Sequence, residues 1–222
     1  MPSNTTYNPG FLRKHYQKLM AAFYDPFMKS LEKVLTGHRR KLLQETSGTV
    51  LEVGAGTGVN FSLYPGDTEV FAIEPSVPMF KRAVKAAADY PNIHVFNTGI
   101  EAVNNHPELP QKFDFVTSML VLCSVPDPQQ AAIIYRDVLK DNGKLLVLEH
   151  IHSTGRLYGK FQSLVNPLWR PFADGCNLTR RQDLILKEVG FVPVFENYFS
   201  LGTDWYEAVM VVESCTSTGS VT

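Results

Sequence analysis

The stretch Val50-Leu51-Glu52-Val53-Gly54-Ala55-Gly56-Thr57-Gly58 decides the fold. Residues 50–53 have the character of a buried strand, and three glycines alternating with small residues follow them directly. A glycine has no Cβ atom, so such a loop turns sharply and lets a ligand approach its backbone closely. The stretch therefore predicts a parallel strand that ends at a ligand-binding edge of a sheet.

Short apolar runs and helix-like segments alternate on either side of this stretch. Their order predicts a doubly wound α/β fold with a mostly parallel sheet, covered by helices on both faces. Helices are expected at about residues 77–89 and 128–140, and Asp141-Asn142-Gly143 is expected to end the second as a glycine cap. The predicted strands are TVLEV (49–53), EVFAI (69–73), IHVF (93–96), FDFVTSM (113–119) and KLLVLEH (144–150).

After the fifth strand the alternation stops. Residues 152–178, rich in Gly, Pro, Trp and Phe, are predicted to form a long connection. A helix follows, which Thr179 is expected to cap and Gly190 to end. Two final runs, FVPVFENYFS and DWYEAVMVVE, predict a closing hairpin, which brings the Rossmann-like sheet to seven strands.

The chain of 222 residues fits one domain with an added segment. We expect an N-terminal helical lid over residues 1–46, made of two amphipathic helices, ahead of the main domain. That domain is expected to cover residues 47–215, with residues 152–178 as an insert that builds the acceptor site. Residues 216–222 are expected to be a disordered tail.

Composition narrows the classes of partner. Lys and Arg number 21 against 22 Asp and Glu, so no net field draws the protein to nucleic acid or an anionic membrane. A small molecule is the expected partner. No apolar run approaches the ~18 residues that a transmembrane helix needs, and the polar start does not resemble a signal peptide. The three cysteines are odd in number and lack metal-ligand spacing, so we expect free thiols, no metal and a cytoplasmic location.

Charge around the glycine loop indicates the kind of cofactor. The loop has the spacing G-x-G-x-G, tighter than the G-x-G-x-x-G of dinucleotide sites. Glu74 ends the second strand sixteen positions after Gly58, where a carboxylate can accept hydrogen bonds from both hydroxyls of a ribose. Because Glu52 adds a second negative charge, a cationic ligand is favoured over a pyrophosphate. This favours S-adenosylmethionine over NAD, with a purely structural turn as the alternative.

Several motifs resemble a known superfamily. VLEVGAGTG with FAIEPS resembles the first two motifs of class I S-adenosylmethionine-dependent methyltransferases. SMLVLCSVPDP and LLVLEHIHS resemble the fourth and fifth strands of that superfamily. The combination of LVLCSV, LEH and DGCNLTR is similar to a narrower group, the thiol S-methyltransferases of the methyltransferase-like seven type. The resemblance covers residues 45–190, but the polar start departs from the hydrophobic membrane anchor of that group.

The resemblance implies which residues contact the cofactor. Gly99 stands where the superfamily usually has an acid, so its contact with adenine is expected through the backbone. Ser76 fits a helix start equally well, and Cys123 fits a small buried thiol better than a nucleophile, because no local motif activates it. The implied cofactor-binding residues are Glu52, Gly54, Ala55, Gly56 and Gly58 for the methionine part, Glu74 for the ribose, Pro75, Ser76, Met79, Gly99, Ile100 and Glu101 around the adenine, and Leu120, Val121 and Cys123 at the pocket floor.

The reaction itself asks little acid–base chemistry of the protein. The transferred carbon is already activated by its sulfonium, so alignment of the reactants and exclusion of water are the main tasks. A thiol acceptor with a pKa of ~8.5 is partly ionised at neutral pH, so a weak base suffices. His150, at the end of the fifth strand, is the expected catalytic base, and a structural role at the strand end is the alternative.

The acceptor site is expected in the aromatic insert and the N-terminal helices. Tyr24, Trp169 and Phe172 are candidate apolar contacts, and Asp174 and Asn177 are candidate polar ones. Lid packing and a structural turn explain these residues nearly as well.

A small apolar thiol is the favoured acceptor. The alternatives are O-, N- or C-methylation of a lipid, quinone or natural product, and a catalytically silent module with the cofactor fold. The balanced charge and the lack of an N/D-P-P-Y-type motif after the fourth strand disfavour nucleic acid as the substrate.

Overall fold

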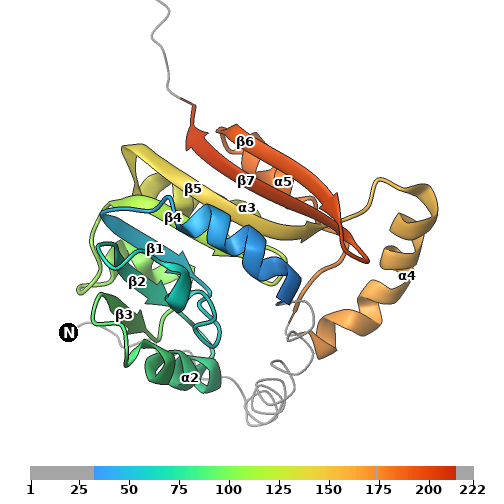
Figure 1. Ribbon diagram of the computed structural model, residues 1–222. Coiled ribbons are helices and arrows are strands. Elements are labelled where there is room, and N and C mark those ends of the chain that lie inside the picture. Colours follow the sequence, from blue (N-terminus) through green and yellow to red (C-terminus); the bar gives the residue numbers. More distant parts are fainter. Residues whose placement is uncertain (1–32, 174, 214–222) are drawn as a thin grey trace, which may run out of the picture.

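The computed structural model describes residues 33–173 and 175–213. Its centre is a seven-stranded sheet in the order β3-β2-β1-β4-β5-β7-β6 (Figure 1). β1 through β5 pair in parallel, and β7 runs antiparallel to both β5 and β6. The strands are β1 (Thr49–Val53), β2 (Glu69–Ile73), β3 (Ile93–Phe96), β4 (Phe113–Met119), β5 (Leu139–Ile151), β6 (Phe191–Ser200) and β7 (Asp204–Val212).

The strand order reverses at β1, which lies between β2 and β4. Adjacent crossovers therefore leave β1 toward opposite faces, and a crevice opens at the carboxyl ends of the strands. The glycine loop begins at that point. The α/β class, the mostly parallel sheet and the closing hairpin are confirmed.

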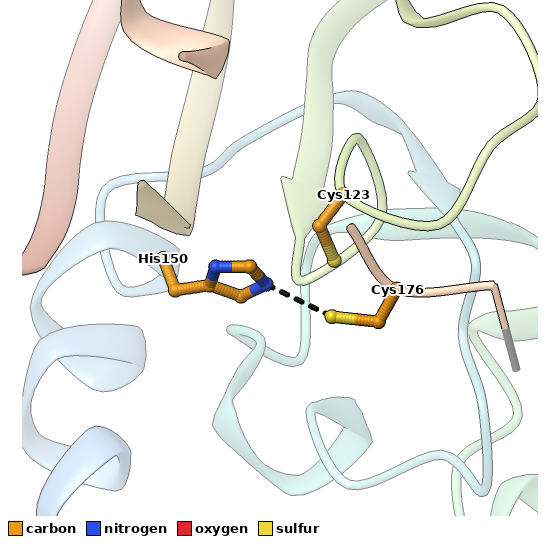
Figure 2. A group of neighbouring side chains, drawn as sticks. All are labelled: Cys123, His150 and Cys176. Carbon is orange, nitrogen blue, oxygen red and sulfur yellow. Dashed lines mark hydrogen bonds between the residues drawn. The ribbon is translucent and has the colours of Figure 1, made fainter. Parts of the chain in front are cut away.

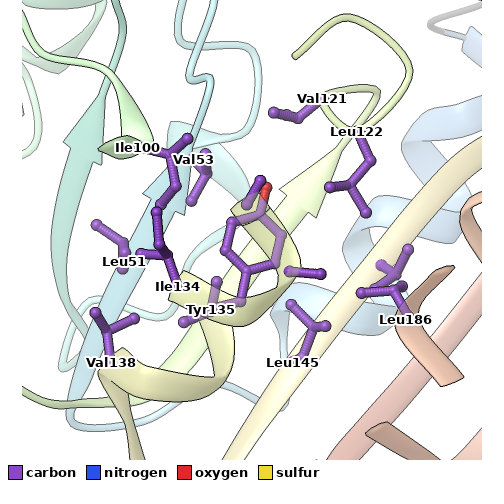
Figure 3. Packing of buried hydrophobic residues seen from close by; sticks show 14 of the residues in the cluster. Leu51, Val53, Ile100, Val121, Leu122, Ile134, Tyr135, Val138, Leu145 and Leu186 are labelled. Atoms are coloured by element: carbon purple, nitrogen blue, oxygen red, sulfur yellow. The ribbon is translucent and has the colours of Figure 1, made fainter. Parts of the chain in front are cut away.

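Helices cover both faces of the sheet. Residues 33–43 are helical and pack with α2 (Val77–Ala87) on one face, through Leu35, Leu43 and Ala83. α3 (Pro128–Val138), α5 (Gln182–Glu188) and the 3-10 segment η2 (Ile100–Asn105) pack on the other face. Figure 3 shows this second layer, in which the side chains of β1, α3 and β5 interdigitate. Another 3-10 turn, η1 (Phe61–Leu63), follows the glycine loop.

The insert contains a helix that the sequence analysis did not predict. α4 (Arg156–Phe172) occupies most of the segment expected to be a connection, although Pro167 and Pro171 lie inside it. Its exposed apolar side chains, Leu157, Phe161, Leu164 and Leu168, recur at helical spacing. This periodicity indicates a helix. The sequence-based prediction gave more weight to the Gly, Pro and aromatic content of the segment, which is typical of a loop. Gln162 anchors α4 by accepting from the Ser153 amide at 2.7 Å and donating to Thr203 Oγ1 at 3.0 Å.

Two expected helix ends are corrected. α3 ends at Val138, and Asp141-Asn142-Gly143 lie inside β5 rather than forming a cap. The reason is that Leu139, only 3% exposed, already pairs with Phe113 in the sheet. α5 begins after Arg181 rather than Thr179, whereas Gly190, with φ +91°, does follow its end.

The structure describes the expected N-terminal lid only over residues 33–46, of which 33–43 are helical. Residues 1–32 and the expected tail lie outside the described residues. Among the residues that the structure describes, no helix is long and apolar enough to cross a membrane.

Candidate functional site

The glycine loop follows β1 and contains three residues whose backbone is in the left-handed conformation. Gly54, Gly56 and Gly58 have φ values of +65°, +59° and +85°. A Cβ atom on Gly54 would lie 2.8 Å from Val121 Cγ2, and one on Gly58 would lie 2.7 Å from Phe61. A Cβ atom on Gly56 would meet nothing within 4 Å. The outer glycines thus allow close packing, and the middle one borders the open space that a cofactor needs.

Glu74 closes the loop onto the end of β2. Its Oε2 accepts from the Gly56 amide at 2.9 Å, and its Oε1 accepts from the Ser76 amide at 2.7 Å. A carboxylate has about four acceptor positions, so both oxygens keep capacity for ribose hydroxyls. Pro75, Gly99 and Glu101 lie together beside it, since a Cβ on Gly99 would be 2.6 Å from Glu101 Oε2 and 4.0 Å from Pro75 Cβ.

Glu52 is a buried carboxyl beneath the loop. It is 2% exposed, and its Oε1 accepts from Asn60 Nδ2 at 2.9 Å. Among the described residues its Oε2 has no hydrogen-bond partner. Burial raises the pKa of Glu52 to about 7, against the opposing effects of Asn60 and Arg39. A buried carboxyl without full compensation suits a cationic ligand, as the sulfonium and ammonium groups of S-adenosylmethionine require.

The turn after β4 forms the floor of the site. Leu120 adopts φ +62°, the one left-handed residue other than glycine in the described chain. Glu149 holds this turn, because its Oε1 accepts from the amides of Val121 at 2.7 Å and Leu122 at 2.9 Å. Glu149 is fully buried, and burial raises its pKa to about 7. It therefore supports the floor of the site from within.

Three reactive side chains converge beside that floor (Figure 2). His150 comes from β5, Cys123 from the turn after β4, and Cys176 from the segment between α4 and α5. The His150 Nε2 and Cys176 Sγ atoms are 3.0 Å apart, and the ligand-type atoms of all three residues lie within 4.8 Å of one another. Cys123 is buried and Cys176 is partly exposed.

The backbone around this cluster is tightly fixed. The Asn177 amide donates to the Cys123 carbonyl at 2.9 Å. Arg180 Nη1 donates to the carbonyl oxygens of Leu122, Cys123 and Val125 at 2.7, 3.0 and 2.7 Å. The segment that carries Cys176 is thereby held against the cofactor floor.

The cluster stabilises a thiolate. A hydrogen bond from Cys123 and the neighbouring His150 lower the pKa of Cys176, whereas the shared hydrogen bond and burial raise the pKa of Cys123. The pKa of His150 is raised despite its burial, because Cys176 favours the protonated ring. Both shifts favour the ionised pair, an imidazolium beside a thiolate.

The composition of the cluster also suits a soft metal ion, but its geometry is that of a hydrogen bond. An ion about 2.3 Å from sulfur and about 2.05 Å from nitrogen, in tetrahedral geometry, separates these two atoms by about 3.6 Å. The observed separation of 3.0 Å is shorter. We therefore treat the three residues as a hydrogen-bonded thiol–imidazole cluster.

The remaining predicted site residues lie in different surroundings. Ala55, Met79 and Ile100 are buried against the loop and the neighbouring layers. Asn177 makes a local turn, because its Oδ1 accepts from the Thr179 amide at 3.0 Å and Thr179 Oγ1 at 2.8 Å. Trp169 is partly buried near Cys176 and helps to lower the pKa of that thiol. Tyr24 and Asp174 lie outside the described residues, as does the side chain of Phe172.

Sequence reasoning missed Cys176 as a partner of His150. The two residues are 26 positions apart, and Cys123 is a further 27 before His150, so no local spacing could reveal the cluster. The only signal was the presence of Cys176 within DGCNLTR.

Comparison with known proteins agrees with this architecture. The family described as methyltransferase domain matches residues 15–194. The chain is 30% identical over 170 residues to human thiol S-methyltransferase TMT1A, covering 73% of this chain and 70% of the relative. It is 30% identical over 179 residues to mouse thiol S-methyltransferase TMT1B, covering 74% and 73% of the two chains.

A solved S-adenosylmethionine-dependent methyltransferase from Thermotoga maritima, described as a possible histamine N-methyltransferase, has the same fold. Its TM-score is 0.61 at 20% identity, over 88% of this chain and 98% of that chain. The chain therefore belongs to the S-adenosylmethionine-dependent methyltransferases, in the family that includes the thiol S-methyltransferases.

Proposed function

We propose that this methyltransferase transfers the methyl group of S-adenosylmethionine to the sulfur of a small apolar thiol. The observation that carries the proposal is the state of Cys176. The cluster beside the cofactor floor already lowers the pKa of one thiol, through hydrogen bonding and the charge of His150. A thiol acceptor that binds beside His150 would have its thiolate form stabilised in the same way.

An acceptor hydroxyl gains far less from such surroundings. A thiol has a pKa of ~8.5, so a small shift makes the thiolate the main form at neutral pH. The acceptor proton passes to solvent, and the thiolate attacks the methyl carbon while the sulfonium sulfur takes up the bonding electrons. In this proposal His150 is the catalytic residue, because its charged ring holds the attacking thiolate.

The cofactor side of the proposal rests on the loop that opens at β1. Glu52 faces the cationic part of the cofactor, Glu74 the ribose hydroxyls, and the open space at Gly56 the methionine chain. Pro75, Gly99 and Glu101 flank the adenine, and Val121 with Cys123 forms the floor. The names of the thiol S-methyltransferase relatives support the choice of acceptor.

The apolar character of the acceptor follows from its surroundings. Trp169 is partly buried near Cys176, and the same helix, α4, carries exposed apolar side chains at Leu157, Phe161, Leu164 and Leu168. A cytoplasmic location is part of the proposal, supported by the two free thiols of the described chain, which suit a reducing compartment.

The test uses acceptors that share one skeleton. Phenylmethanethiol, phenylmethanol and phenylmethanamine are compared with methyl-labelled S-adenosylmethionine, and a thiol of similar size that carries a carboxylate tests the apolar requirement. We expect methylation of the apolar thiol, with a higher KM for the charged one. Turnover of the alcohol or the amine without any thiol product would decide for the O- or N-methyltransferase alternative.

A further inference from the structure

Cys123 and Cys176 form a pair of neighbouring thiols. Methyl transfer to an acceptor does not require two protein sulfur atoms side by side, so the proposed function leaves this pair unexplained. The pair lies beside the proposed acceptor position, one member buried and the other partly exposed. Both belong to the described chain, and neither is bonded to another cysteine there. Figure 2 shows the two sulfur atoms pointing toward one another, with the imidazole of His150 on one side.

The backbone geometry allows these two residues to be joined. The hydrogen bond of 2.9 Å from the Asn177 amide to the Cys123 carbonyl places the two segments side by side. Disulfides need Cα atoms about 4.4–6.8 Å apart, so the two backbones must lie close together, as this hydrogen bond requires of the adjoining residues. The sulfur atoms start within 4.8 Å of each other, so rotation of the side chains brings them most of the way to bonding distance.

The two thiols are unequal in reactivity. Cys176 is accessible, lies 3.0 Å from His150 and is favoured as the thiolate, which is the nucleophilic form. Cys123 is 2% exposed and is favoured as the thiol. An accessible thiolate next to a second thiol is the arrangement of a cysteine that reacts with peroxide and is then resolved.

We propose that Cys176 and Cys123 form a reversible, peroxide-driven disulfide that closes the acceptor site. In the first step the Cys176 thiolate attacks hydrogen peroxide, which gives a sulfenic acid and hydroxide. In the second step the Cys123 thiol attacks the sulfenic sulfur, which forms the disulfide and releases water. A dithiol reductant restores both thiols and is itself oxidised to a disulfide.

The disulfide removes the acceptor surroundings without touching the cofactor loop. It withdraws the thiolate from His150 and fills the space between the β4 turn and the segment before α5. Gly56, Glu52 and Glu74 take no part in it. Oxidation is therefore expected to abolish methyl transfer, whereas S-adenosylmethionine should still bind through the contacts of Glu52, Gly56 and Glu74. The loss of activity rests on the proposed function, but formation of the disulfide does not.

The experiment counts thiols in the whole chain. A Cys215→Ser background leaves Cys123 and Cys176 as the only cysteines. This protein, freed of metal by a chelator, is treated with hydrogen peroxide, and the remaining thiols are alkylated and located by peptide mass spectrometry. We expect loss of both thiols, a peptide linking Cys123 to Cys176, and full recovery with dithiothreitol.

Single variants test the order of the steps. In Cys123→Ser, Cys176 is expected to stop at a sulfenic acid that dimedone traps, and in Cys176→Ser, Cys123 is expected to stay reduced. His150→Ala should slow the oxidation of Cys176 at pH 7 by at most about 30-fold, because the thiol returns only part of the way to its ordinary pKa while the hydrogen bond from Cys123 remains. Faster reaction of Cys123, or two intact thiols after peroxide treatment, would overturn the inference.

The same samples separate this inference from the proposed function. If thiols are methylated but no linked peptide forms, only the disulfide is wrong. If the linked peptide forms but no thiol is ever methylated, the proposed acceptor is wrong and the disulfide stands. Complete loss of cofactor binding in the oxidised protein would contradict the placement of the disulfide outside the glycine loop.

Discussion

Replacing Glu52 by glutamine should stabilise the cofactor-free protein and weaken cofactor binding at the same time. Glu52 is buried, and its pKa rises from 4.5 to about 7 in the folded chain. Between these values the folded protein binds a proton that the unfolded chain has released. Stability therefore falls as the pH rises through this window, and it levels off above the folded pKa.

The expected size follows from the shift. One pKa unit corresponds to about 1.4 kcal/mol, so ionising Glu52 in the folded protein costs about 3 kcal/mol at pH 8 and less than about 1 kcal/mol at pH 5. Glutamine has nearly the same shape and keeps an oxygen that can accept from Asn60, but it does not ionise. Because Glu149 is unchanged in both proteins, its own titration cancels from the difference.

Urea unfolding at pH 5 and pH 8, without and with S-adenosylmethionine, measures both effects. Without cofactor, Glu52→Gln should be more stable than wild type at pH 8, with little difference at pH 5. Saturating cofactor should stabilise the wild type more, because the variant lacks a charge-assisted interaction of roughly 1.5–3 kcal/mol. The exposed Glu108→Gln is the matched control and should change neither quantity. A variant less stable than wild type at pH 8, or a difference independent of pH, would refute the reasoning.

Three further predictions concern the loop and the thiol cluster. Gly56→Val should abolish S-adenosylmethionine binding in a folded protein, because the branched side chain fills the open space at the loop. Gly56→Ala also places a side chain at this positive φ, but its smaller side chain should allow tighter binding in calorimetric titration. Glu74→Ala should weaken cofactor binding, because both the carboxylate and its hydrogen bond to the Gly56 amide are lost. The wild-type protein should not bind NAD. Tighter binding of NAD than of S-adenosylmethionine would contradict the methyltransferase assignment. His150→Ala should lower kcat/KM for a thiol by less than about 100-fold, and the pH profile should shift with the acceptor's own pKa when a more acidic thiol is used. Complete loss of activity in a folded His150→Ala protein would instead show an essential enzyme-bound base.

Local patterns were enough to place the sheet. The strands 49–53, 69–73, 93–96, 113–119 and 191–200 have the expected bounds, because each is a short apolar run between clear breaks. The glycine loop was located for the same reason, since its spacing depends only on adjacent residues. Such features are decided within a few positions of the chain.

Features decided by distant contacts were not predictable in this way. β5 starts at Leu139 because that side chain is buried against Phe113, which overrides the glycine signal at Gly143. The pairing of Cys176 with His150 depends on the segment that Arg180 fixes to the β4 turn. α4 was missed for a different reason, because composition was given more weight than its helical periodicity.

The central claim is that sulfur is the atom that receives the methyl group. An acceptor that carries both groups on one ring, 4-mercaptophenol, tests it within a single molecule, since binding and access are then the same for both atoms. With methyl-labelled S-adenosylmethionine and the reduced enzyme, mass spectrometry and NMR of the product identify the methylated atom. We predict the S-methyl product in large excess; the O-methyl product as the main species would contradict the proposal.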